Sequence, residues 1–110
     1  METYRYHEAV LLALTDLLEI ANSENSEFEP AYYLERMLML ERLADSGRVM
    51  GQYGDRDRFN RNYQLEDSLR HQIVDFGSTI EPSKLIEVLD KVQQGSVVAM
   101  ALRNAATNQS

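Results

Sequence analysis

The sequence predicts an all-α protein of four to five helices in a single domain. Apolar residues recur at helical spacing in separate segments, and residues that typically begin or end helices bound these segments. No two β-rich segments are available to pair with each other. With 110 residues and 44% apolar side chains, the chain is long enough for one core. We expect the domain to cover residues 1–107 and residues 108–110 to be frayed.

The first helix is expected over residues 3–21. The segment NSENSE that follows, Asn22–Glu27, ends it, because these side chains compete for backbone hydrogen bonds. The helix carries apolar residues over more than one face, and those at helical spacing are Val10, Leu14, Leu17, Leu18 and Ala21.

The second helix is expected over about 30–45. Pro30 is tolerated in a first helical turn, whereas Ser26 and Glu29 have the spacing of a capping box that would start the helix earlier. Gly47 is the expected end signal. One face carries Tyr33, Met37, Leu40 and Ala44, and further apolar residues spread around the helix.

Two or three helices are expected in the second half of the chain. A third, over about 62–76, ends at Gly77, and Pro82 opens a fourth. Gly95 then interrupts the pattern, and we expect residues 96–106 to be helical, with a strand as the alternative. The third helix aligns Leu65, Leu69, Ile73 and Phe76 on one face.

The segment GRVMGQYGDRDRFNRNYQ, Gly47–Gln64, is expected to be a long loop between the second and third helices, and long loops are often functional. Its glycines do not have P-loop spacing. Asp55 and Asp57 alternate with arginines, which favours a protein-contact surface or a loop held by its own ion pairs over a phosphate site. With two tyrosines of the first two helices, the expected binding residues are Arg48, Tyr53, Arg56, Arg58, Phe59, Arg61, Tyr63, Tyr6 and Tyr32.

The charge distribution disfavours nucleic acid as a partner. The net charge is −7, and residues 1–45 hold ten acidic residues against three arginines. Such a field repels phosphates at long range. The chain has no cysteine, and the apolar run near its N-terminus is too short and too interrupted for a membrane span or a signal peptide. We therefore expect a cytoplasmic protein with no membrane partner.

No catalytic residue, metal ligand or cofactor is predicted. Asp67, His71 and Asp75 share one face of the third helix, but the chain has no Glu-x-x-His pair of the kind that helical di-metal proteins need. The surplus of apolar residues on the first two helices predicts a helical homodimer. The expected function is a small regulatory or adaptor protein that binds another protein. The alternatives are a nucleic-acid-associated regulator that uses its arginine–aromatic loop, and a metal-dependent helical enzyme.

Overall fold

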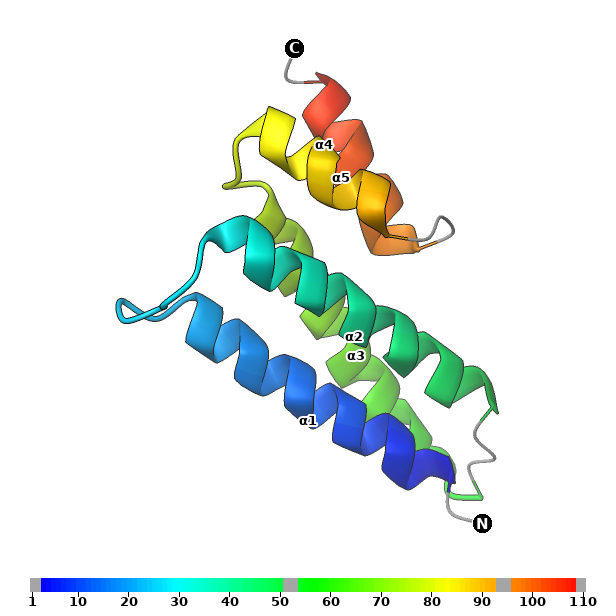
Figure 1. The fold of residues 1–110 in the computed structure, drawn as a ribbon. Coiled ribbons are helices and arrows are strands. Elements are labelled where there is room, and N and C mark those ends of the chain that lie inside the picture. Colours follow the sequence, from blue (N-terminus) through cyan, green and yellow to red (C-terminus); the bar gives the residue numbers. More distant parts are fainter. Residues whose placement is uncertain (1–2, 51–53, 93–95, 109–110) are drawn as a thin grey trace.

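The structure is a computed structural model that describes residues 3–50, 54–92 and 96–108 (Figure 1). These ranges hold five helices and no strand, which confirms the all-α prediction, and the last segment is helical rather than extended. The helices are α1 (Thr3–Ala21), α2 (Pro30–Met50), α3 (Arg56–Gly77), α4 (Pro82–Lys91) and α5 (Val97–Asn108). No helix in these ranges is long and apolar enough to cross a membrane.

The first three helices form one packed unit, and α4 and α5 form a hairpin against one end of it. In Figure 1, α1 and α2 run antiparallel, α3 packs behind both, and α2 lies between α1 and the hairpin. The start of α1, the end of α2 and the start of α3 lie at one end of the molecule, and the end of α5 lies at the other. The core draws on all five helices, with Leu11, Leu14, Leu34, Met37, Leu69, Ile73, Leu89 and Leu102 among its most deeply buried members.

The connection between α2 and α3 is much shorter than the sequence suggested. The expected loop is mostly helix, since residues 48–50 belong to α2 and residues 56–63 belong to α3. Asp55 caps α3, because its side chain accepts a hydrogen bond from the backbone N–H of Arg58 at 3.1 Å. The turn chemistry of this segment therefore starts a helix where we expected a loop.

Gly47 does not end α2, which corrects the prediction made from it. It is a buried contact point between α1 and α2, where an added Cβ would lie 3.0 Å from Cδ1 of Tyr6 and 3.4 Å from Cα of His7. The absence of a side chain lets the two helices approach closely. Gly77 lies similarly close to α5, since a Cβ there would lie 2.7 Å from Cδ2 of Leu102.

The turn between α1 and α2 is organised by a buried tyrosine. The hydroxyl oxygen of Tyr33 accepts hydrogen bonds from the backbone N–H groups of Glu27, at 3.1 Å, and Phe28, at 3.3 Å. These bonds satisfy donors of the turn that precedes α2 and fix the antiparallel return of the chain. Pro30 is the first residue of α2, as expected.

Candidate functional site

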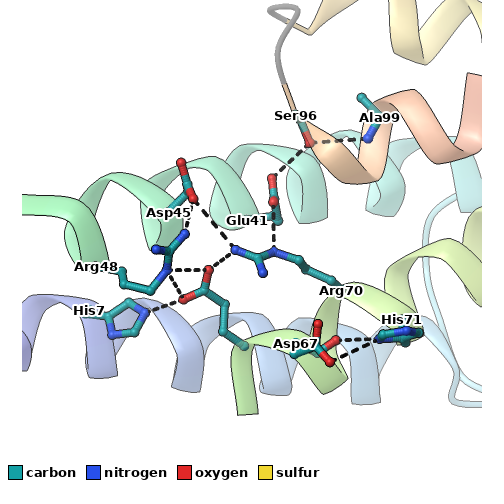
Figure 2. Close-up of polar contacts among 10 residues, drawn as sticks. His7, Glu41, Asp45, Arg48, Asp67, Arg70, His71, Ser96 and Ala99 are labelled. Carbon is teal, nitrogen blue, oxygen red and sulfur yellow. Dashed lines mark hydrogen bonds and ion pairs between the residues drawn. The ribbon is translucent and has the colours of Figure 1, made fainter. Parts of the chain in front are cut away.

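A buried polar cluster joins the three long helices, near the start of α1, the end of α2 and the middle of α3. Its central member is Glu66 on α3, whose side chain is 1% exposed. Nε2 of His7 on α1 lies 2.7 Å from Oε1 of Glu66, and Nε of Arg48 on α2 donates to both carboxylate oxygens at 3.2 Å. Arg70, one turn further along α3, pairs with Oε2. The partners converge on one carboxylate in Figure 2, so the cluster links α1, α2 and α3.

A second carboxylate extends the cluster to α5. Oε1 of Glu41 accepts a hydrogen bond from Nε of Arg70 at 3.3 Å, and its Oε2 accepts one from the Ser96 hydroxyl at 3.1 Å (Figure 2). The Ser96 oxygen accepts in turn from the backbone N–H of Ala99 at 3.2 Å, which is a helix N-cap. Glu41 on α2 therefore positions the first turn of α5.

The buried polar atoms of the cluster are paired within the described part of the chain. Among the described residues, no buried side-chain nitrogen or oxygen lacks a hydrogen-bond partner. Buried charges are tolerated where they are paired and hydrogen-bonded in this way. The carboxylate oxygens of Glu41 and Glu66 are thus bonded to side chains of the same chain, and a polar pocket of 180 Å³ lies beside Glu41 and Arg70.

Burial raises the pKa of Glu41 above its ordinary value of 4.5, because burial disfavours the charged carboxylate. A raised pKa in the folded state gives a stabilising contribution that is full below pH 4.5 and is lost as pH rises through the folded pKa. We therefore expect the unfolding free energy of the parent protein to rise relative to that of Glu41→Gln as pH falls from neutral towards 4.5. Urea titrations of both proteins across this range check it, and parallel pH profiles would contradict it.

The pKa of Glu8 is lowered rather than raised, so Glu8 and Glu41 affect stability in different pH ranges. Nε of Arg58 donates to Oε2 of Glu8 at 2.8 Å and Nδ2 of Asn62 donates to the same oxygen at 2.6 Å, while the Arg58 guanidinium stacks 3.9 Å from the Tyr4 ring centroid. The hydrogen bond from Arg58 lowers the pKa of Glu8 to about 2. Its contribution is present above pH 4.5 and is lost as pH falls towards 2, so it does not obscure the Glu41 window.

The four arginines expected to bind a partner divide into two kinds. Arg48 belongs to the buried cluster, and Arg58 is bonded to Glu8. Arg56 and Arg61 are exposed on α3, and neither makes an ion pair with another described residue. The arginines therefore do not form one cationic surface.

The expected aromatic contacts lie at the two ends of the three-helix unit. Phe59 and Tyr63 stack on α3 with ring centroids 6.1 Å apart, and Arg48 lies 5.5 Å from the Tyr63 ring. Tyr6 is exposed on α1. Tyr32 stacks on Phe28 at 4.5 Å and lies under the guanidinium of Arg36 at 4.4 Å, far along α2 from Arg48. Tyr53 lies outside the described residues.

The apolar surplus that the sequence placed on the first two helices has a definite position. Met39 and Leu43, one turn apart on α2, are 54% and 43% exposed. We call this pair the outer ridge. It lies between two grooves, one of 460 Å³ shared with α1 (the α1 groove) and one of 390 Å³ that Lys91, Val92 and Ser96 also line (the α4 groove).

Both grooves are largely apolar with charged rims. The α1 groove is lined by Ala13, Leu17, Ile20 and Leu40 besides the outer ridge, with Asp16 and Arg36 at its edge. The α4 groove is lined by Leu38 and Val92, with Glu35, Arg42 and Lys91 at its edge. A contiguous apolar surface rimmed by polar residues is the usual form of a protein-contact site.

In the described part of the chain, no group of three or more histidine, aspartate or glutamate side chains could hold a metal ion. His71 is instead exposed, with Nδ1 2.8 Å from the backbone oxygen of Asp67. Comparisons of the chain with protein-family models, with curated proteins and with solved structures found no match. The function is therefore argued from the contacts of the molecule itself.

Proposed function

We propose that this protein acts by binding another protein chain through the outer face of α1 and α2, with no catalytic step of its own. The observation that carries the proposal is the outer ridge, two large apolar side chains half-exposed between two apolar grooves. Burying such side chains against a partner is favourable, at about 25 cal/mol for each Å² of apolar surface removed from water. A small regulatory or adaptor protein of the cytoplasm, working as a homodimer, fits this mode of action.

The arrangement of the arginines favours protein binding over nucleic-acid binding. Arg48 and Arg58 already pair with carboxylates of the same chain, and pairs of this kind leave few donors for phosphates. The net charge of −7 opposes the approach of a polyanion as well. The metal-dependent alternative has no cluster of ligands among the described residues to support it.

The proposal predicts that Met39→Glu removes a bound protein. The tagged chain is expressed in its host together with an untagged copy, and the proteins that copurify with it are identified by mass spectrometry. We expect at least one protein, whether the untagged copy or another chain, to fall by about tenfold or more with Met39→Glu, because a carboxylate at the centre of an apolar interface would be buried without a partner.

The matched control is Met100→Glu, which places the same charge at a residue 60% exposed on α5, outside both grooves. The control is expected to retain the bound protein. Equal recovery of every copurifying protein by the parent, Met39→Glu and Met100→Glu would refute the proposed function.

A further inference from the structure

We propose that the chain seated on the outer ridge is a second copy of this protein, with the two α2 helices packed antiparallel about a two-fold axis beside Met39. This inference rests on the proposed function and adds the identity of the partner. It is carried by Glu35 and Arg42, two opposite charges of the α4 groove. Such an axis brings each of them opposite the residue of opposite charge in the second copy.

The α4 groove is built on one continuous face of α2. Its lining residues from this helix follow the spacing i, i+3, i+4, i+7 and i+8, which places them on one stripe: Glu35, Leu38, Met39, Arg42 and Leu43. The stripe has an apolar centre and one charge at each end. In Figure 1, α2, which carries this stripe, lies between α1 and the α4–α5 hairpin.

Glu35 and Arg42 are unpaired among the residues that the structure describes. Neither makes an ion pair or a side-chain hydrogen bond with any other residue that the structure describes. They stand seven residues apart, about 10 Å along the helix axis, which is too far for the two to pair with each other. These two charges of α2 are therefore available to another molecule.

An antiparallel two-fold axis satisfies both charges with a single operation. Glu35 and Arg42 lie on the same side of the stripe, and in an antiparallel pair this side of one α2 faces the same side of the other. Glu35 therefore comes opposite the partner's Arg42, and Arg42 comes opposite the partner's Glu35. The midpoint between positions 35 and 42 lies at Leu38 and Met39, so the two ion pairs lie on either side of Met39. A parallel pairing would place like charges opposite each other, which disfavours it.

The overall charge makes the local complementarity necessary. Two chains of net charge −7 repel each other at long range, so a second copy needs apolar contact and paired rim charges to remain bound. The Met39 and Leu43 side chains of each copy supply the apolar contact by entering the α4 groove of the other, beside Val92. Binding of an unrelated partner would not require opposite charges at equal distances on either side of Met39.

A charge exchange tests the pairing. Sedimentation equilibrium of the purified chain is expected to show a dimer, and Glu35→Arg and Arg42→Glu are each expected to raise its dissociation constant by about tenfold or more. The double variant, with Glu35→Arg and Arg42→Glu together, restores opposite charges across the axis and should return the constant to within about threefold of the parent value. Arg61→Glu, an equal charge change at an exposed residue of α3, is the control and should leave dimerisation unchanged.

Three results would overturn the inference: a parent chain that is monomeric at all concentrations, single variants that dimerise as the parent does, or a double variant as weak as the single ones. Thermal unfolding of each variant, followed by circular dichroism, confirms that all remain folded. The proposed function and the identity of the partner can be tested independently of each other. A monomeric purified chain that still loses a different protein with Met39→Glu would remove the second copy and leave protein binding intact.

Discussion

Glu66→Ala is expected to lower the free energy of unfolding by about 3–5 kcal/mol, the usual cost of removing one partner from a buried ion pair. The alanine would leave the partly buried guanidinium groups of Arg48 and Arg70 without their shared carboxylate, and Nε2 of His7 would lose its contact with Glu66. Small domains are stable by only about 5–15 kcal/mol, so this single change removes a large part of the margin.

Urea unfolding followed by far-ultraviolet circular dichroism measures this effect. Asp67→Ala is the matched control, since Asp67 is the next residue of the same helix and is exposed. A surface change of this kind is expected to alter the unfolding free energy by no more than about 0.5 kcal/mol. Equal midpoints for Glu66→Ala and Asp67→Ala would mean that the buried cluster does not hold the helices together.

Leu102→Ala is expected to cost about 2–5 kcal/mol, the range for deleting a fully buried leucine side chain. Leu102 is 0% exposed and packs against Gly77, so it joins α5 to the end of α3. The cavity would open between the hairpin and the three-helix unit, beside Gly77, which has no side chain to fill it. We therefore expect backbone amides of α5 to lose hydrogen-exchange protection before those of α1 and α2.

Met100→Ala is the control for this effect, because Met100 lies on the same helix but is exposed. It removes a side chain of similar size from the surface of α5 and should change the unfolding midpoint little. Comparable losses of stability for the two variants would show that Leu102 does not fix α5 to α3.

Helix boundaries were predictable where the signal lies within the helix itself. α1 covers the expected residues 3–21, and both prolines open helices, because their fixed φ suits a first turn and their missing N–H would have had no partner there. Gly47 misled the prediction because a glycine can end a helix or admit a neighbouring one. Which of these it does depends on Tyr6 and His7, about forty residues away in the chain.

The buried cluster was missed, although part of its signal is visible in the sequence. Glu66 falls on the same stripe as Leu69 and Ile73, and Glu41 falls on that of Met37 and Ala44, so each is an acidic residue at a core position. Leu65, which we expected on the core face of α3, is exposed instead. Apart from Arg70, which shares α3 with Glu66, the partners of these acids come from other elements, and the periodicity of one helix carries no information about them.

The sequence predicts that some apolar surface of the first two helices is exposed, but not which residues form it. The surplus of apolar residues on the first two helices indicates that some apolar surface stays uncovered. Only the packing of α3 and of the α4–α5 hairpin decides that Leu38 is buried while Met39 and Leu43 remain exposed. The sequence alone does not show that Glu35 and Arg42 line the same groove, and this is what makes them candidates for pairing with a second copy.

The claim that the outer ridge is a contact between two chains is tested most directly by the molar mass of the purified protein, measured by sedimentation equilibrium over a wide range of concentration. We predict that the mass approaches twice the 12.7 kDa of one chain as concentration rises, and that Met39→Glu keeps it at the mass of one chain. A parent protein that stays at 12.7 kDa at every concentration, or a Met39→Glu variant that dimerises as the parent does, would contradict the claim.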